Sequence, residues 1–255
     1  MRTEDQFLDR MRSELADGTY PPGTVLPTQR DLAAQYGHDV REIRAAMQRL
    51  EAAGLVRIRR KAGTVVLDPT PVRRMGIERY ARHRWAVDGV APFESDVSAE
   101  SSTQPTVDQR NEVSTVAAPE DVATALQVNT GDAVVYRRRK LFDSADQPTH
   151  ILTSWYRAND VVGTELMDTE PGTAGRGGGF AVLHRAGLGP DEIAEELELR
   201  EPTTDEATEL DIPPTLLVVD LRRWVWTANG RPVEYARGIH HSLRFRWSYR
   251  FKVPE

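Results

Sequence analysis

Two arginines at the spacing of one helical turn offer the most distinctive chemistry in the sequence. When the residues after Asp39 are wound as a helix, Arg41 and Arg44 share a face with Ala45 and Gln48, and this face points towards solvent or DNA. An arginine can donate two hydrogen bonds to guanine. The plain alternative is that these charges are only solvated, as charges on helices usually are.

The elements that must position these arginines have clear boundaries. Thr28 is followed by Asp31 at the spacing of a capping box, which predicts a helix start, and Gly37 supplies a short turn. Asp39 can cap the arginine-bearing helix, and Gly54 ends it. The expected core positions of this helix are Ile43, Ala46, Met47 and Leu50.

A basic two-stranded ribbon is expected directly after this helix. In residues 55–60 two apolar side chains alternate with arginines, so one face of the strand is basic. Residues 61–63 can turn the chain into a second strand, and residues 4–17 have the apolar spacing of an earlier helix. Three helices and a basic ribbon in this order predict a winged helix-turn-helix, which favours DNA contact over a merely solvated surface.

This part of the chain resembles the DNA-binding domain of GntR-type bacterial transcription regulators. Residues 22–33, PGTVLPTQRDLA, match the family's PxGxxLPSERELA segment, and residues 38–55, HDVREIRAAMQRLEAAGL, resemble its recognition helix. The resemblance implies that Arg30 and Arg44 contact DNA. It also implies that Gly63, together with Lys61, lies at a wing tip that enters the minor groove.

The recognition segment departs from the family where bases are read. Val40 stands at the family's base-reading arginine, Glu42 replaces a hydroxyl residue, and Arg41 is the candidate for the missing guanidinium. Glu42 can accept a hydrogen bond from cytosine or only pair with a neighbouring arginine, and both alternatives stay open. The predicted DNA-contacting residues are Arg30, Asp39, Val40, Arg41, Glu42, Arg44, Gln48, Lys61, Gly63 and Thr64.

Composition limits the other classes of protein. The 255 residues suffice for two modest domains, and the absence of cysteine excludes disulfides and thiolate metal sites. The first residues, MRTEDQFLDR, lack the apolar run of a signal peptide, and no stretch approaches a membrane-spanning length. We therefore expect a cytoplasmic bacterial protein that acts on nucleoid DNA.

Charge is distributed unevenly along the chain. The net charge is -6, but residues 1–84 carry 16 Lys and Arg against 11 Asp and Glu, a net charge of +5. The remaining residues carry a net charge of -11. A basic N-terminal part followed by an acidic remainder of the chain suits local contact with DNA.

The second half mixes strands with short helices. Asn229-Gly230 is a strong hairpin signal. Expected strands cover residues 133–142, 150–156, 216–227, 232–241 and 243–253, and expected helices begin at Pro119, Phe180 and Thr204. Residues 188–199 fit a strand or a helix, and residues 94–110 fit a loop or an edge strand.

Three motifs in this half resemble the UTRA effector domain found in the HutC branch of GntR regulators. They are GDAVVYRRR at 131–139, QP followed by LTSW between 147 and 155, and GRPVEY at 230–235. The resemblance implies an α+β fold: an N-terminal winged helix-turn-helix plus a C-terminal chorismate-lyase-like antiparallel sheet with helices. The expected domains are 1–68 for DNA binding, 69–92 as linker, and 93–255 for effector binding and dimerisation.

The expected linker is rich in arginine. It could lie along DNA phosphates, pack Ile77, Tyr80 and Trp85 on the second domain, or simply be solvated.

The resemblance also implies a ligand pocket on the central sheet. The family's strand arginine corresponds to Arg139, or to Lys140 with a different gap, while a ligand carboxylate of other members maps near the apolar Leu152. The predicted effector-binding residues are Arg139, Ser154, Arg176, Glu234, Tyr235 and Arg237. Because strand residues alternate, only one of the pairs Glu234–Ala236 and Tyr235–Arg237 can face the pocket. We expect a small effector that carries an acid or several hydroxyls, although a surface or core role is the alternative for each residue.

An enzyme is the weakest interpretation. His240 and His241 are adjacent on an expected strand, so they point to opposite faces and cannot chelate one metal together. The GRGGG run at 175–179 lacks the Lys-Ser/Thr of a phosphate-binding loop, and no GxSxG motif is present. We therefore expect a protein with no catalytic residues, no metal and no cofactor. A lyase or a hydrolase is the least favoured alternative.

The sequence as a whole predicts an effector-responsive transcription regulator, expected to be a repressor. Its expected partners are double-stranded operator DNA of near-palindromic sequence, a small-molecule effector and a second copy of the chain, with no membrane. The alternative is a DNA-binding regulator without an effector, or a plasmid or architectural protein, and response to a ligand distinguishes the two.

Overall fold

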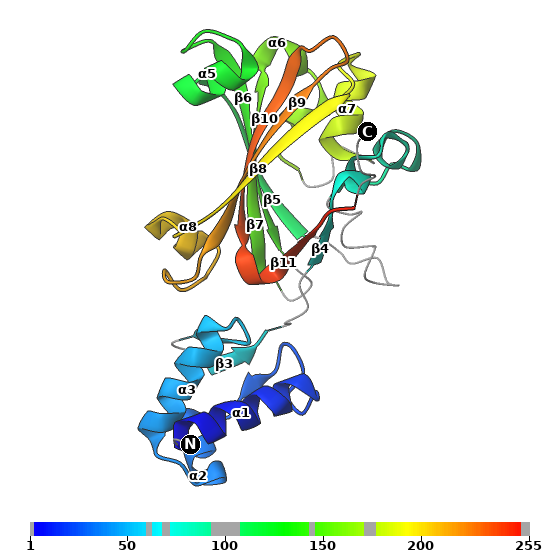
Figure 1. Ribbon diagram of the computed structural model, residues 1–255. Coiled ribbons are helices and arrows are strands. Elements are labelled where there is room, and N and C mark those ends of the chain that lie inside the picture. The colour runs from blue at the N-terminus through cyan, green and yellow to red at the C-terminus, as the bar shows by residue number, and fades with distance from the viewer. Residues whose placement is uncertain are drawn as a thin grey trace. The chain divides into compact units, whose positions relative to one another are not determined.

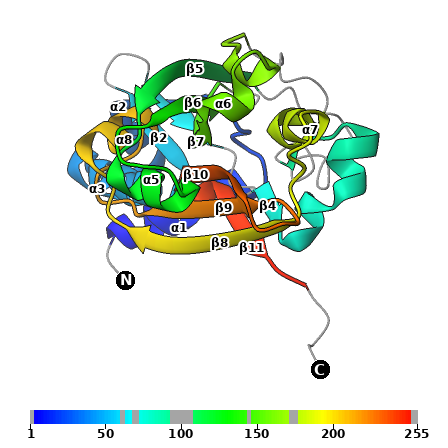
Figure 2. The same cartoon turned by 90° about the horizontal axis from the view of Figure 1, so that it is seen from above.

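The computed structural model describes residues 3–59, 63–67, 72–92, 108–142, 146–170 and 177–250. The chain forms two compact units, Met1–Pro71 and Val72–Glu255, and each is described by itself. Figure 1 shows both units, and Figure 2 shows them turned by 90°.

The first unit consists of three helices and a small sheet. Its elements are α1 (Thr3–Ala16), β1 (Val25–Leu26), α2 (Gln29–Tyr36), α3 (Val40–Ala52), β2 (Val56–Arg59) and β3 (Gly63–Val66). The strands pair in the order β1-β3-β2, and both pairs are antiparallel. The predicted winged helix-turn-helix architecture is confirmed.

The apolar spacing of the helices explains how this unit packs. The four predicted core residues of α3 are fully buried, and α1 buries Phe7, Leu8 and Met11 in the same core. Thr28 caps α2, because its side chain accepts a hydrogen bond from the backbone N–H of Asp31. Gly37 ends α2 with a φ of 70°, in the left-handed region that favours glycine.

The second unit is built on one antiparallel sheet of six strands. In sheet order these are β5 (Asp108–Ala117), β6 (Ala133–Phe142), β7 (Pro148–Arg157), β10 (Pro232–His241), β9 (Val218–Trp226) and β8 (Glu192–Arg200). Figure 2 shows the strands following one another in this order. The predicted hairpin of β9 and β10 is present, and the predicted antiparallel sheet with helices is confirmed.

Helices cover both faces of this sheet, as Figure 1 shows. We call one face the α5 face, because α5 (Glu120–Leu126) packs there against Val134 and Tyr235, and α8 (Thr204–Glu209) packs beside Ile151 and Ile239. The opposite face is the α7 face, where Phe180 of α7 (Gly178–Arg185) packs against Val135, Tyr156 and Val225. Shorter helical elements are η1 (Ile77–Tyr80), η2 (Arg84–Asp88), α6 (Ala158–Val161), η3 (Glu165–Met167) and η4 (Ser242–Arg244).

A separate pair of strands joins the start of the second unit to its end. β4 (Val72–Met75) pairs in parallel with β11 (Phe245–Ser248), so Val72 lies opposite Phe245. The last strand was expected over 243–253, and a strand is present there: its described part is β11, which pairs with β4 outside the six-stranded sheet. A parallel partner so distant in sequence leaves no local pattern by which it could be predicted.

The segment expected as a linker contributes to the core of the second unit. Trp85 is 2% exposed and packs with Tyr80 against Phe180, whereas Ile77 is 64% exposed. Of the alternatives left open for residues 72–92, packing on the second unit is therefore the one observed for Tyr80 and Trp85. Residues 188–199, open between strand and helix, contain β8, and residues 94–110 contain the start of the edge strand β5.

Candidate functional site

Helix α3 presents a polar face to solvent because its apolar face is used in packing. Ile43, Met47 and Leu50 are fully buried, and Arg41, Arg44 and Gln48 on the opposite side are exposed. Val40 at the helix start is 41% exposed. This is the arrangement that the sequence predicts for a helix in contact with DNA.

The guanidinium groups of this unit are available to a ligand. Within the described part of the chain, Arg30, Arg41 and Arg44 have no side-chain hydrogen bond or ion pair. By contrast, Arg49, one turn after Ala45, donates to Asp5 at 2.8 Å. Unpaired exposed arginines on α2 and α3 are suited to phosphate oxygens and base edges.

The two acidic residues at the start of α3 stabilise the helix end. Asp39 accepts from the backbone N–H of Arg41 at 2.7 Å, and Glu42 accepts from the backbone N–H of Asp39 at 3.2 Å. The His38 ring also lies 3.5 Å from the Glu42 carboxylate. A capping box accounts for the position of Glu42. Neither of the two roles left open for it, base reading or pairing with an arginine, is needed to explain that position.

The ribbon places its predicted residues differently. Gly63 has a φ of 83°, in the left-handed region, and a Cβ there would lie 2.9 Å from a methyl group of Val25, so any other residue would be strained at this position. Thr64 is 8% exposed, between Leu26 and Ile58 on the neighbouring strands, so its side chain faces inward. Lys61 lies outside the described residues.

In the second unit, Arg139, Ser154 and Glu234 gather on the α7 face from three adjacent strands. The Nη2 of Arg139 donates to Ser154 Oγ at 3.0 Å. Tyr156 donates to one oxygen of Glu234 at 2.9 Å, and Arg223 donates to the other at 3.0 Å. These side chains form a buried polar cluster, which we call the β-sheet polar cluster: Arg139, Ser154, Tyr156, Arg223 and Glu234.

The charge state of Glu234 follows from its neighbours. Burial by itself raises the pKa of this carboxyl, but the Arg223 guanidinium and hydrogen bonds from Ser154 and Tyr156 hold the pKa below its ordinary value. Glu234 is 2% exposed and therefore remains a carboxylate inside the protein. With Glu234 paired to Arg223, the positive charge of Arg139 has no carboxylate partner of its own among the described residues.

Unused hydrogen-bonding atoms lie beside Arg139. Asn111 on β5 is the register partner of Arg139, so their side chains are neighbours on the same face. The Nε of Arg139 and both polar side-chain atoms of Asn111 are buried and have no hydrogen-bond partner in the described structure. Buried polar groups are nearly always paired, so this position is suited to a polar ligand.

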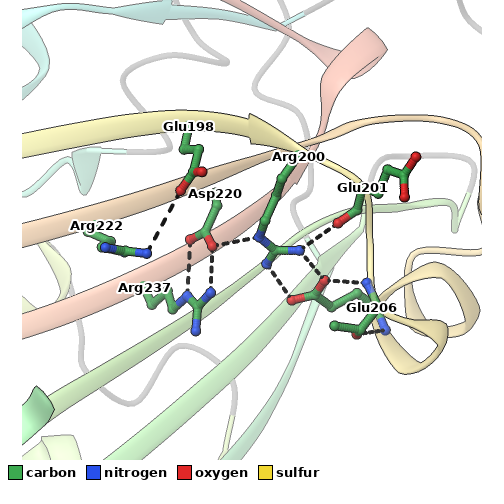
Figure 3. A network of polar contacts seen from close by, with 8 residues as sticks. Glu198, Arg200, Glu201, Glu206, Asp220, Arg222 and Arg237 are labelled. Carbon is green, nitrogen blue, oxygen red and sulfur yellow. Dashed lines mark hydrogen bonds and ion pairs between the residues drawn. The ribbon is translucent and has the colours of Figure 1, made fainter.

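Tyr235 and Arg237 lie on the opposite, α5 face. Figure 3 shows Arg237 in a network in which its guanidinium and that of Arg200 both contact Asp220. Asp220 is 1% exposed, and Arg200 also donates to Glu206 of α8 at 2.7 Å. Tyr235 packs between Trp155 and Trp224. Of the two alternating pairs, the structure thus groups Glu234 with Arg139, and it separates Tyr235 and Arg237 from them.

Three further residues named for this site by the sequence lie apart from the cluster, beside it, or outside the described chain. Arg176 lies outside the described residues. Lys140 is on the α5 face, where its amino group lies 5.4 Å from the Phe142 ring centroid. Leu152 is the register partner of Arg139 on β7, so an apolar side chain does adjoin the arginine.

Several buried polar residues in and beside the cluster were missed by the sequence analysis. Arg137, on the same face of the sheet, is 2% exposed, and its guanidinium donates to the carbonyls of Asp168 at 2.7 Å and Leu166 at 3.3 Å. Strand alternation puts Arg137 on the same face as Arg139, so this signal was present in the sequence. Asn111 and Arg223 carried no such signal, because they depend on which strands are neighbours.

The described residues also form open clefts away from the polar cluster. One of about 670 Å³ is lined by Tyr80, Trp85, Glu195, Leu197 and Tyr249, among others. Another of about 620 Å³ lies between α5 and β9. Neither is lined by Arg139, Ser154 or Glu234.

The described residues carry no signature of a metal site or of a membrane-spanning helix. Nowhere among them do three or more His, Asp or Glu side chains converge as metal ligands would. His240 stacks on His150 with ring centroids 4.8 Å apart, and His241 accepts from the backbone N–H of Leu243 instead. None of the described helices combines the length and apolarity needed to cross a bilayer.

Comparison with known proteins agrees with both halves of this geometry. The profile described as bacterial regulatory proteins, gntR family, matches residues 3–66, and the UTRA domain profile matches residues 167–246. An uncharacterised HTH-type transcriptional regulator of Streptomyces coelicolor is 41% identical over 250 residues, which cover 98% of this chain and 93% of the relative.

Solved structures show the same fold. A structure assigned to the GntR family of transcriptional regulators has a TM-score of 0.58 at 25% identity, and the match covers 100% of this chain and 99% of the other. PhnF of Mycobacterium smegmatis also has a TM-score of 0.58, at 19% identity, over 97% of this chain and 100% of PhnF. The Streptomyces relative and the first of these structures are described as transcriptional regulators and not as enzymes, as predicted. The chain therefore belongs to the GntR family of bacterial transcriptional regulators and carries a UTRA domain behind its winged helix-turn-helix.

Proposed function

We propose that the protein is a homodimeric repressor that binds a near-palindromic operator on nucleoid DNA and responds to a small acidic effector. Two copies of α3 read two half-sites, because a two-fold protein matches two-fold DNA. Occupancy of a promoter then blocks transcription. The observation that supports DNA reading most directly is the exposed face of α3 with the unpaired Arg41 and Arg44.

The residues have distinct roles in this proposal. Arg44 and Arg30 contact bases or phosphate, Arg41 contributes to specificity, and Gly63 with Lys61 approaches the minor groove. Asp39 and Glu42 act indirectly, since they fix the start of α3. Val40, Gln48 and Thr64 were predicted to contact DNA as well, and the exposure of Val40 and Gln48 is compatible with that, whereas Thr64 is turned inward.

The effector site is proposed around Arg139, Ser154 and Glu234. A buried polar atom without a partner costs about 1–3 kcal/mol, and three such atoms lie together at Arg139 and Asn111. An anionic group with a neighbouring hydroxyl or amide would satisfy them. Effector binding changes operator affinity only if it prefers one arrangement of the dimer, and the change is then reciprocal.

The DNA-binding part is tested by selection of genomic fragments. Purified full-length protein is incubated with sheared genomic DNA at low ionic strength, and the retained fragments are sequenced. The expected result is a small set of promoter fragments that share an inverted repeat. Recovery of random fragments would support an architectural protein instead, and recovery of none would contradict the proposal.

The effector part is tested with a panel of small carboxylic and phosphoric acids. The readouts are the melting temperature of the protein and release of a selected fragment. Arg139→Ala should abolish the response, and Lys140→Ala is the matched control because it removes the same charge from the next residue, on the opposite face. A response of Arg139→Ala at unchanged concentrations would place the effector elsewhere. If no acid acts on the wild type, the effector-independent alternative is favoured.

A further inference from the structure

The β-sheet polar cluster continues, without interruption, into the segment that follows the DNA-binding unit. Arg223, which holds Glu234 from one side, also donates to the hydroxyl of Tyr80 at 3.4 Å. That hydroxyl in turn contacts Arg74 at 2.9 Å and donates to Glu195. Arg74 lies on β4, three residues after the boundary between the two units.

These contacts are built from buried side chains. Arg74, Arg223 and Glu234 are buried, and the Glu195 side chain is 12% exposed in its pair with Arg74. The Arg223 guanidinium also lies over the Phe180 ring, 5.3 Å from its centroid, and this packing limits its alternative positions. Hydrogen bonds in such a low-dielectric interior are strong and depend on one another.

Among the described residues, the backbone of β4 is not hydrogen-bonded to the six-stranded sheet. β4 pairs there with the short strand β11, whose Phe245 and Trp247 rings contact His240 of β10. The pair of Arg74 with Glu195 of β8, together with the Tyr80 hydroxyl, ties β4 itself to the sheet through side chains. A change at Glu234 that moved Arg223 would act on Tyr80 first and on this tie next.

We propose that Arg223 and Tyr80 are positioning residues that connect the effector site at Glu234 to β4, and thereby to the chain that leads to the DNA-binding unit. An effector that engages Arg139 and Ser154 competes for or reorients the bonds of Glu234. The Arg223 guanidinium then shifts its bonds between Glu234 and Tyr80, and the anchoring of β4 changes. This inference rests on the proposed function, because it assigns the regulation of the same site.

Amide hydrogen exchange of the full-length protein tests the connection without any effector or DNA. Glu234→Gln removes the carboxylate charge that holds Arg223. We expect amide exchange in residues 72–80 to accelerate roughly threefold or more, in the range of measured couplings between connected sites. Asp220→Asn is the matched control, because it makes the same change at an equally buried carboxylate on the opposite face, and it should leave residues 72–80 unchanged.

A second variant keeps the test decisive if Glu234→Gln does not fold. Tyr80→Phe removes only the hydroxyl, and it should accelerate exchange in residues 72–80 by roughly tenfold, because its bonds to Arg74 and Glu195 are charge-assisted. By reciprocity it should also accelerate exchange around residues 232–236. Its matched control is Tyr249→Phe, since Tyr249 lines the same cleft and its hydroxyl has no hydrogen bond among the described residues.

The outcomes separate this inference from the proposed function. The connection would be overturned if Glu234→Gln left amide exchange in residues 72–80 unaltered, or if Asp220→Asn altered it equally. It would also be overturned if the effect of Tyr80→Phe were confined to residues 72–80. None of these results depends on DNA selection or on finding the effector. A failure of those experiments would leave the exchange result unaffected.

Discussion

At the scale of single residues, the exposed face of α3 separates DNA contact from folding. Arg44 has no side-chain partner in the described structure, so its removal should leave stability unchanged. Arg44→Ala should weaken operator binding by about 1–3 kcal/mol, the value of one good base contact. Fluorescence anisotropy with a selected fragment measures this loss, and Arg12→Ala on α1 is the charge-matched control. An affinity equal to that of Arg12→Ala would remove Arg44 from the interface.

The buried pair of Arg74 and Glu195 should make the stability of the fold depend on pH. Burial raises the pKa of Glu195, but the Arg74 guanidinium and the Tyr80 hydroxyl outweigh it and lower this pKa from 4.5 to about 2. The folded-state pKa is thus below the unfolded one, so the pair stabilises the fold above about pH 4.5. This stabilisation, on the order of 3 kcal/mol, is lost as pH falls towards 2.

Urea unfolding at a series of pH values checks this. The wild type should lose stability between pH 5 and pH 2, and Glu195→Gln should be less stable at pH 7 and have a flatter profile, because Arg74 then stays buried without its carboxylate. Glu196→Gln, at the exposed next position, should resemble the wild type. Equal profiles for the Glu195 and Glu196 variants would refute the assignment.

Residue types alone predicted only part of the candidate sites. Helical spacing identified Arg41, Arg44 and Gln48 as one exposed face, and the structure agrees. Strand alternation separated Glu234 from Tyr235 and Arg237 but could not say which side faces Arg139. That choice depends on the order of strands in the sheet, and strand order is not encoded in the period of one strand.

At the scale of elements, two capping boxes allow the units to be perturbed one at a time. Asp39 caps α3 of the first unit, and Thr203 caps α8 of the second in the same way. Replacing either by alanine should cost about 1 kcal/mol of stability in its own unit. All five tryptophans, at 85, 155, 224, 226 and 247, belong to the second unit.

This distribution of tryptophans gives the measurement. Asp39→Ala should shift the unfolding transition followed by far-ultraviolet circular dichroism but not the one followed by tryptophan fluorescence, and it should weaken operator binding. Thr203→Ala should shift the fluorescence transition. If Asp39→Ala moved the fluorescence transition as much as Thr203→Ala does, the caps would not act within their own units.

Elements with a strong local pattern were predicted well, and those with long-range partners were not. The hairpin of β9 and β10 follows from Asn229-Gly230, and α3 follows from its caps and apolar spacing. β8 was ambiguous because both of its faces are largely exposed, so its apolar pattern is weak. β11 was expected as a strand, but its partner could not be predicted, because β4 lies at the other end of the unit.

At the scale of the whole molecule, charge is less segregated than the sequence suggested. The unit that ends at Pro71 carries 11 Lys and Arg against 10 Asp and Glu, a net charge of +1. Much of the basic excess up to residue 84 therefore belongs to the second unit, where Arg74 and Arg82 pair with Glu195 and Asp191. Attraction to DNA must come from the local arrangement of arginines, not from net charge.

The salt dependence of operator binding tests this view. Each phosphate contact contributes about 0.9 to the slope of log affinity against log salt concentration. Affinity should fall as salt rises, and Arg30→Ala should reduce the slope by roughly 2 in a dimer, one contact in each copy. Arg246→Ala, an exposed arginine of the second unit, is the control. A slope equal for wild type and Arg30→Ala would exclude a phosphate contact at Arg30.

The parallel pairing of β4 with β11 bears on how the protein can be engineered. As long as β4 is docked, only residues 68–71 separate it from the described end of the first unit at Leu67. A chain truncated before Phe245 would lose β11, the partner of β4. The connection to the DNA-binding unit of each copy would then be longer. A longer connection lowers the effective concentration of the second DNA-binding unit at a bound operator. Truncation before Phe245 would thereby lower operator affinity, although it removes none of the residues proposed to contact DNA.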